Sequence, residues 1–200
     1  MANAAFGFRP VRMIDGSPFN AAQRLMFVSA SDSVNLFPGD LVTAGTQTYT
    51  NNPRNLPTVT QSAASQSNTL GVVISVDPII AYQGSNVGLE NLYRLYRPAS
   101  TAGYVLVCTD SRVVYELALD GAASALSASE INQGYNIDIT VGTGSTATGV
   151  SAMQGASAGI ATTSTFPCRI LGFSQRTDNT PGLLSSVIEV VLQTIQPTRS

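Results

Sequence analysis

Short apolar runs, each ended by a cluster of turn-forming residues, constrain the fold of this chain most. The run 70–76 ends at an Asp-Pro turn pair, and residues 113–119 alternate between a strongly apolar set and a more polar set. Residues 137–141 and 188–193 show the same period of two, which is typical of a strand with one buried face. With seventeen Gly and ten Pro among 200 residues, this pattern predicts a mostly β domain, either a jelly-roll-like sandwich or a small β-barrel.

A polar turn separates two neighbouring strand patterns. The apolar run 104–108 is followed by Thr109, Asp110 and Ser111, and the alternating run 113–119 begins after them. Two strand patterns joined by a short polar turn are typical of a β-hairpin. We therefore expect these two runs to pair directly with each other.

Three polar segments of low complexity interrupt the strand patterns, at residues 43–69, 120–136 and 142–165. In the second segment, Ser127 and Ser129 are suited to cap a short helix whose first turn contains Glu130. The other two are expected to be long loops. Uncharged loops of this length, rich in Ser, Thr and Ala, are suited to lie against a neighbouring chain.

One glycine-rich stretch has the glycine spacing of a phosphate-binding loop. Gly144 and Gly149 have that spacing, but Val150 stands where such a loop needs a lysine to reach the phosphates. The stretch 142–151 is therefore expected to be a flexible turn after the strand at 137–141, with no bound cofactor.

The first 24 residues differ in character from the rest of the chain. Pro10, Gly16 and Pro18 break any helical period, and aromatic and Arg side chains are frequent. Aromatic side chains on an extended segment need a surface to cover them, either on the same domain or on another subunit. We predict an extended N-terminal arm at residues 1–24 and a single β-rich domain with long polar loops at residues 25–200. The arm residues expected to bind a partner are Phe6, Phe8, Arg9, Arg12 and Phe19.

A second cluster of tyrosines and arginines follows in the middle of the chain. Its members are Tyr93, Arg94, Tyr96 and Arg97. Tyr and Arg are common at interface hot spots because they combine large rigid area with directional hydrogen bonds. Two interpretations remain open: a partner-binding patch, or a strand or short helix whose arginines are solvated.

The charged residues are few and acidic on balance. All ten basic residues are arginines, and the formal net charge is −2 with a sequence pI of about 4.9. No overall basic field attracts a phosphate backbone, so nucleic acid is not an expected partner. No run of about 18 apolar residues predicts a membrane span, and the N-terminus lacks the apolar run of a signal peptide. We therefore expect no membrane partner.

The residue types of the commonest catalytic sites are absent. The chain has no His and no Lys, so neither a Ser-His-Asp triad nor a Ser-Lys dyad can form. Two cysteines without histidine do not make a zinc site, and the twelve acidic residues show no Asp-x-Asp run. A glycosidase needs only two carboxylates, but Asp77, Asp110 and Asp178 occur in turn-like contexts, which favours Asx turns. We expect no enzyme activity, no catalytic residue, no metal site and no cofactor.

Cys108 and Cys168 lie 60 positions apart in apolar, strand-like segments. Two cysteines do not make a disulfide framework, and buried thiols behave as small apolar side chains. We expect both to be reduced core residues, while their spacing by itself leaves a disulfide open.

Five stretches distributed over most of the chain form one recognisable pattern: residues 6–12, 15–20, 36–42, 70–73 and 105–116. Together they resemble the capsid cement, or decoration, proteins of tailed bacteriophages, including phages of cyanobacteria. In that family the residue before Asp110 tends to be acidic as well, and here it is Thr109. The acidic pair of the family is therefore incomplete in this chain.

The resemblance implies a virion protein, commonly a homotrimer, on the outer surface of the capsid, where it clamps adjacent capsomers and stabilises the phage head. The implied partners are the major capsid protein and further copies of the chain itself. Composition agrees, because Arg binds carboxylates bidentately and is less strongly hydrated than Lys. The lack of His also removes the side chain that titrates between about pH 5 and 8. The alternative, from a different class, is a β-sandwich that binds a ligand, such as a glycan-binding head fibre.

Overall fold

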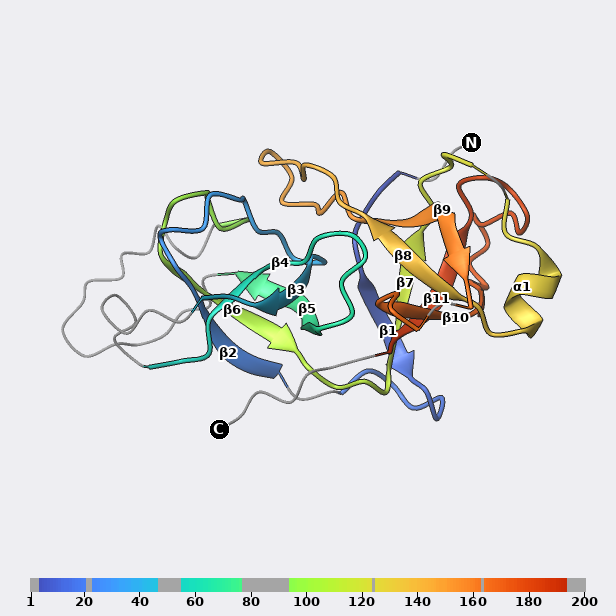
Figure 1. Ribbon diagram of the computed structural model, residues 1–200, viewed down its shortest axis with the longest axis horizontal. Coiled ribbons are helices and arrows are strands. Elements are labelled where there is room, and N and C mark those ends of the chain that lie inside the picture. Colours follow the sequence, from blue (N-terminus) through green and yellow to red (C-terminus); the bar gives the residue numbers. More distant parts are fainter. Residues whose placement is uncertain are drawn as a thin grey trace.

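The computed structural model describes residues 4–20, 23–46, 55–76, 94–123, 125–162 and 164–193. It contains two antiparallel β-sheets packed together, which confirms the expected mostly β sandwich. The described strands close no barrel. Figure 1 shows the larger sheet at the right and the smaller sheet at the left.

The larger sheet has six strands in the order β1-β7-β11-β10-β8-β9. Their bounds are β1 (Arg9–Met13), β7 (Val113–Ala118), β11 (Val187–Leu192), β10 (Cys168–Phe173), β8 (Asn136–Thr140) and β9 (Gln154–Ala161). The alternating runs at 137–141 and 188–193 are strands β8 and β11, as predicted. β7 lies between β1 and β11, and all six of its residues are buried. Both faces of this strand are therefore covered, whereas its alternation had indicated one buried face.

The smaller sheet has five strands in the order β2-β6-β5-β3-β4. Their bounds are β2 (Gln23–Val28), β6 (Gly103–Cys108), β5 (Thr69–Val76), β3 (Leu41–Ala44) and β4 (Val59–Gln61). Its two outer strands approach each other, because the Phe27 N–H donates to the Pro57 carbonyl at 2.9 Å and Phe27 forms a parallel bridge with Thr58. The sheet therefore curves strongly around an aliphatic core of its own.

The hairpin predicted from residues 104–108 and 113–119 is wrong. β6 pairs with β2 and β5, whereas β7 pairs with β1 and β11 in the other sheet. The chain crosses between the sheets through a tight turn in which the Asp110 carboxylate accepts from the Arg112 N–H at 2.9 Å. Val114 and Ala118, on the more polar side of the alternation, are also fully buried. A strand that is apolar on both faces is best placed in the centre of a covered sheet.

The main hydrophobic core joins the two sheets. Leu41, Val72 and Cys108 come from the smaller sheet, and they pack with buried residues such as Tyr115 and Ile188 of the larger one. A second core belongs to the smaller sheet alone and consists of Met26, Val28, Leu36, Val42, Val59, Leu70, Val73, Val76, Val105 and Val107. The main core therefore crosses the junction between the two sheets.

Part of the segment predicted as an arm belongs to the larger sheet. β1 pairs with β7, and Phe8 and Met13 are 2% and 4% exposed members of the main core. Phe19 packs against the same core. The structure therefore corrects the predicted division at residue 24. Proline excludes a helix interior, but it is compatible with an edge strand, where Pro10 lies.

The short helix predicted near residues 127–130 is confirmed as α1 (Ala128–Asn132). Ser127 is its N-cap, and its hydroxyl accepts from the Glu130 N–H while the Glu130 carboxylate accepts from the Ser127 N–H at 2.7 Å. This reciprocal pair is a capping box. No helix among the described residues has the length and apolar content needed to cross a membrane.

Two of the polar segments expected to be loops contain strands, namely β4 within 43–69 and β9 within 142–165. Neither has the apolar alternation of a strand, because both lie at a sheet edge where small and polar side chains are tolerated. At Gly155 on β9, an added Cβ would lie 2.9 Å from Ile137 Cδ1. The small residues thus allow close packing rather than indicating irregular backbone.

The glycine-rich stretch 142–151 is a turn, as predicted, and it fastens the larger sheet to the smaller one. Ser145 and Val150 form an isolated bridge that closes the turn. At its end, the Ser151 hydroxyl donates to the buried carboxylate of Asp40 at 2.6 Å. The stretch therefore has a packing role in this fold.

Both cysteines are free and buried, as expected. Cys108 lies at the end of β6 and Cys168 at the start of β10, and both belong to the main core. Burial raises the pKa of the Cys168 thiol well above its ordinary value, so the thiol stays protonated and unreactive.

Candidate partner-binding groove

A groove of about 490 Å³ lies where the two sheets meet. Its lining comes from segments far apart in the sequence: the N-terminal segment, the turn before β3, β5, the end of the turn 142–151 and the residues after β10. The lining includes Phe6, Arg9, Pro10, Ile74, Val150 and Arg176. The groove is thus an apolar hollow with two arginines beside it.

The backbone around Gly39 holds one wall of the groove in place. The Phe8 N–H donates to the Gly39 carbonyl at 2.8 Å, and the Gly39 N–H donates to the Val73 carbonyl at 2.8 Å. Gly39 has a φ of +93°, and an added Cβ would lie 3.2 Å from the Phe6 carbonyl oxygen. A glycine is required here, because other residues avoid this backbone region. The N-terminal segment is therefore tied directly to the smaller sheet.

A buried glutamate on β7 organises the arginines beside the groove. Glu116 is 4% exposed, and its carboxylate lies 3.0 Å from Arg9 Nη2 and 3.7 Å from Arg176 Nη1. The Ser174 hydroxyl donates to its other oxygen at 2.6 Å. A buried carboxylate is costly unless it is paired. Glu116 therefore needs both arginines close to the edge of the sheet.

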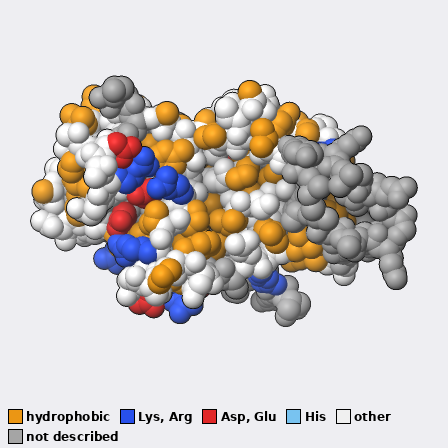
Figure 2. Space-filling model, turned by 180° about the vertical axis from the view of Figure 1, so that it is seen from behind, with side chains coloured by type: hydrophobic (Ala, Val, Ile, Leu, Met, Phe, Trp, Pro, Cys, Tyr) orange, Lys and Arg blue, Asp and Glu red, His pale blue; other side chains and the backbone are white. Residues whose placement is uncertain are grey.

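Arg176 links the charged cluster to the apolar lining. Its guanidinium lies 5.7 Å from the centroid of the Phe6 ring and also donates to the Asp178 carboxylate at 2.6 Å. The hydrogen bond with Asp178 raises the pKa of Arg176 and lowers the pKa of Asp178. Close by on the sheet, Arg12 pairs with Glu189 of β11. Figure 2 shows a face on which Arg, Asp and Glu side chains gather beside hydrophobic side chains.

The structure brings some of the predicted arm residues together and removes others from the surface. Phe6 and Arg9 line the groove, and Arg9 keeps 57% of its side chain exposed. Arg12 is 37% exposed in its pair with Glu189. Phe8 contacts the Tyr115 ring edge-on at 5.9 Å, inside the main core. Phe8 borders the groove, but at 2% exposure its ring stabilises the fold and is not free to bind a partner, and the half-buried Phe19 packs against the same core.

Two members of the central Tyr/Arg cluster, Tyr96 and Arg97, have structural roles. Arg97 was predicted to bind a partner, but it is fully buried and donates to the carbonyls of Ser29, Val34 and Thr101 at 2.6 to 2.8 Å. Tyr96 stacks on Phe37 with a centroid distance of 5.2 Å. Arg94 is exposed, and Tyr93 lies outside the described residues. Neither of the two sequence interpretations anticipated an arginine inside the protein.

Asp40 is a second buried carboxylate at the junction. It is 1% exposed and accepts from the Phe37 N–H at 2.9 Å, from Gln61 at 3.0 Å and from the Ser151 hydroxyl at 2.6 Å. Burial raises the pKa of Asp40 to about 6, and the three hydrogen bonds oppose that rise. The carboxylate joins the turn before β3, strand β4 and the segment after β8.

Asp110 and Asp178, two of the acidic residues considered for catalysis, have local roles. Asp110 accepts from the Arg112 N–H at 2.9 Å, which is the Asx turn expected for it. Asp178 instead pairs with Arg176, and Asp77 lies outside the described residues. Within the described ranges, no three Asp, Glu or Cys side chains gather in a group that would hold a metal ion.

Sequence reasoning missed Arg176, Pro10 and Ile74 as residues of the groove. Arg176 lies in a polar turn between two strands, and its only local signal is the acidic residue two positions later. Ile74 resembles any other apolar residue of a buried strand. No periodic pattern marks residues that become neighbours only when two sheets meet.

Comparison with known proteins does not place the chain in a family, because no family model, no curated protein and no solved structure matches it.

Proposed function

We propose that the chain is a capsid cement, or decoration, protein that binds outside the major capsid lattice of a tailed phage. The groove between the sheets is the observation that carries the proposal. It combines apolar residues such as Phe6, Pro10 and Val150 with two partly exposed arginines, Arg9 and Arg176. An apolar centre with Arg at its edge is a common composition of protein interfaces.

The proposed partner at the groove is the major capsid protein, and the proposed assembly is a homotrimer. Several large apolar side chains are exposed elsewhere on the described surface, among them Ile14, Leu183 and Leu184 at 47 to 53% exposure. Scattered exposed apolar residues are ordinary, but an assembly that covers them gains about 25 cal/mol for each Å² removed from water. We propose a trimer because the cement proteins that the sequence resembles are commonly trimeric.

The proposal is tested on virions of the phage that encodes the chain. Deleting the coding sequence should leave assembled heads without one set of outer protrusions in electron cryomicroscopy, and these heads should release DNA at a lower temperature. Purified protein should then bind back to the deficient heads in a saturable manner. Heads that are unchanged by the deletion, or that take up no added protein, would exclude the cement function.

Two exposed valines offer a matched pair of variants for the groove. Val150 lies in the groove and Val141 lies outside it, and each is 39% exposed. Val150→Asp should weaken rebinding to deficient heads at least tenfold, because it places a charge in an apolar contact. Val141→Asp should leave rebinding unchanged. Equal effects of both substitutions would show that the groove is not the attachment surface.

A further inference from the structure

Three arginines, Arg9, Arg12 and Arg176, pair with two carboxylates of the larger sheet, those of Glu116 and Glu189. The two glutamates lie directly opposite each other on β7 and β11, so their side chains share one face of the sheet. The glutamate side chains are 6% and 17% exposed, whereas the arginine side chains are 28 to 57% exposed. This face therefore presents guanidinium groups outward and keeps its carboxylates beneath them.

A β-bulge in β1 places two of these arginines on the same face. Arg9 lies opposite Glu116. Arg12 lies opposite Val114, because the register shifts after Pro10. Residues three apart in a regular strand point to opposite faces, whereas Glu116 and Val114 are two apart and share a face. The extra residue of the bulge thus turns Arg12 to the side on which Arg9 lies.

Arg12 and Arg176 already have internal hydrogen-bond partners. Arg12 donates to the Glu189 carboxylate. Arg176 donates from Nε and Nη2 to the two carboxylate oxygens of Asp178, at 2.9 and 2.6 Å, and its guanidinium lies against the Phe6 ring. A guanidinium that holds one carboxylate with two N–H groups has fewer donors left for a second. Both side chains are therefore occupied within the protein.

Arg9 differs from the other two, because its donors are not used. Its Nη2 lies 3.0 Å from Glu116 Oε2, but that oxygen has no hydrogen-bond partner, so the contact is an ion pair without hydrogen-bond geometry. Within the described part of the chain, the Arg9 guanidinium donates no hydrogen bond. An Arg side chain carries five N–H donors in a planar fork. At 57% exposure, this fork is anchored by Glu116 and open to a ligand.

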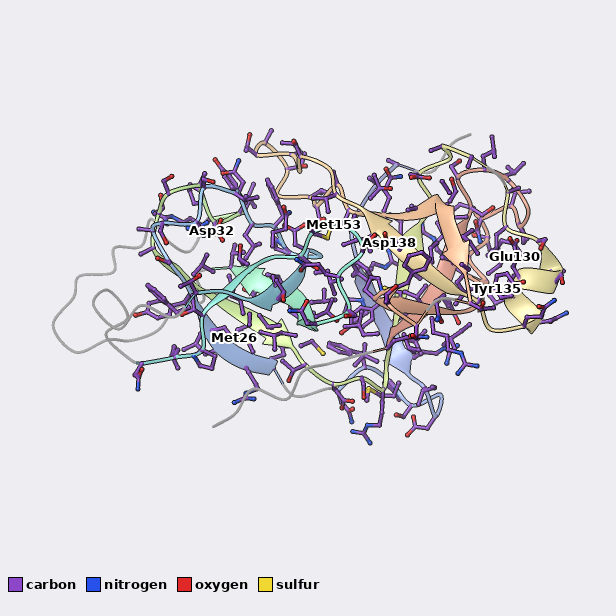
Figure 3. All side chains as sticks on the ribbon, in the orientation of Figure 1. Met26, Asp32, Glu130, Tyr135, Asp138 and Met153 are labelled. Carbon is purple, nitrogen blue, oxygen red and sulfur yellow. The ribbon has the colours of Figure 1, made fainter. Side chains whose placement is uncertain are left out.

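The chain itself supplies no second carboxylate to Arg9. Among the described residues, Glu116 is the one acid within ion-pair distance of it. Other carboxylates hold their own segments: Glu130 caps α1, and Asp138 accepts from the Ser65 hydroxyl at 2.7 Å. Figure 3 shows Glu130 in α1 and Asp138 on β8, both away from β1. A carboxylate that engages the unused fork therefore comes from another molecule.

The surroundings of Arg9 suit a carboxylate carried on a mostly apolar segment. Phe6, Pro10, Ile74 and Val150 line the same groove. In an interface such residues exclude water from an ion pair, which strengthens the pair relative to one in free solvent. A carboxylate matches the planar fork, because two parallel N–H···O bonds form together. The negative charge beneath Arg9 also favours a singly charged carboxylate over a doubly charged phosphate.

We propose that the groove binds an Asp or Glu side chain of its partner through the guanidinium of Arg9. This inference rests on the proposed attachment of the groove to the major capsid protein. The apolar residues of the groove supply buried area, and Arg9 supplies specificity for an acidic residue at one point of the partner surface.

Rebinding to phage heads that lack the protein tests the role of Arg9. Arg9→Gln should bind at least tenfold more weakly than the native chain, because the partner carboxylate loses its charged donor. Added salt should weaken binding of the native chain, and the variant should lose most of that salt dependence. Arg112→Gln is the matched control, because Arg112 is 68% exposed in its pair with Asp110 and lies outside the groove. It removes the same charge and should bind like the native chain.

The absence of lysine from the chain allows the bound group to be identified. Arg9→Lys introduces a single side-chain amine and keeps a positive charge beside Glu116. With this variant bound to heads, a carbodiimide should join the amine to a carboxylate in contact with it. An amide bond forms, and the carbodiimide takes up the elements of water as a urea. Mass spectrometry should place the new amide at an Asp or Glu of the major capsid protein, and Arg112→Lys should give no such product.

The outcomes separate this inference from the proposed function. Saturable binding of the native chain, with Arg9→Gln equally tight, would overturn the role of Arg9 and leave the cement function standing. Amide bonds confined to carboxylates of the variant's own chain, on heads saturated with Arg9→Lys, would overturn it as well. Urea unfolding checks that Arg9→Gln is folded in the assay, and Arg9→Lys, which retains the charge, replaces it if it is not. Failure of the native chain to bind would refute the cement function and this inference with it.

Discussion

The two sheets of this protein differ in how their buried residues are held in place. The larger sheet carries most of the main core, in which Phe8 and Tyr115 of β7 are in edge-on contact. The smaller sheet has an aliphatic core of its own, and the buried guanidinium of Arg97 holds the connection between β2 and β3 by donating to the carbonyls of Ser29 and Val34. The comparison teaches that both sheets depend on packing area, and that the smaller sheet depends in addition on a buried arginine that holds the connection beside it.

Arg97 should show the largest effect on stability. Arg97→Met keeps the volume but leaves the carbonyls of Ser29, Val34 and Thr101 without their charged donor. The free energy of unfolding should fall by about 5 kcal/mol, because buried carbonyls lose hydrogen bonds that nothing replaces. Urea denaturation followed by circular dichroism measures the loss.

The controls for Arg97 test the polar interpretation directly. Arg97→Lys retains a charge and three donors, so it should lose less than Arg97→Met. Arg112, which is 68% exposed in its pair with Asp110, should tolerate Met with little change. Because Leu41, Val72 and Cys108 of the smaller sheet pack in the main core with residues of the larger sheet, each variant should unfold in one transition. Two separate transitions would show that the sheets are independent and would break the comparison.

Phe8 tests the packing side of the comparison. Phe8→Ala should cost about 4 kcal/mol, because a fully buried aromatic ring is replaced by a cavity. Phe27→Ala is the matched substitution in the smaller sheet, where Phe27 is 2% exposed and contacts Tyr104 at 5.7 Å. Hydrogen exchange should place the loss of protection around β1 and β7 for the first variant and around β2 and β6 for the second.

Phe8→Ala also distinguishes a core residue from a residue that binds a neighbouring subunit. If Phe8 acted mainly on a neighbouring subunit, Phe8→Ala would weaken association and leave the urea midpoint of the dissociated chain unchanged. That result would contradict the buried position of Phe8.

Asp40, at the junction between the sheets, should make stability depend on pH. Its pKa is raised from 3.8 to about 6 by burial, so the folded protein binds a proton that the unfolded chain has released. The contribution of Asp40 is therefore most favourable below pH 4 and is lost as pH rises through 6. The difference amounts to about 3 kcal/mol between these limits.

Asp40→Asn isolates this contribution. The amide oxygen still accepts from the Phe37 N–H, and the amide N–H₂ group is able to donate to Ser151. The stability of the variant relative to the native chain should rise as the pH increases from 4 to 7.5, and urea unfolding at several pH values measures this rise. Asp178→Asn, at an exposed pair, is the control. A constant stability difference between native chain and Asp40→Asn across this range would contradict the raised pKa.

Local patterns predicted much of the secondary structure. The alternation at 137–141 and 188–193, the apolar run at 70–76 and the capped helix after Ser127 are properties of neighbouring residues, and the structure confirms each. Local pattern failed at β9, whose small residues show no apolar period, and at β7, whose second buried face was hidden by Glu116. Sequence periodicity detects a difference in hydrophobicity between the two faces of a strand, and it gives no signal where that difference is small.

The sequence by itself determined that this chain is a mostly β protein with few charges, no histidine or lysine and two cysteines in apolar runs, because these are properties of composition and spacing. Only the tertiary structure decided that residues 104–108 and 113–119 belong to different sheets, that Arg97 is interior, and that Phe6, Ile74 and Arg176 share one groove. The physical reason is that strand partners and burial depend on contacts between distant segments. A local pattern records which face of a strand is apolar, but it does not record what covers that face.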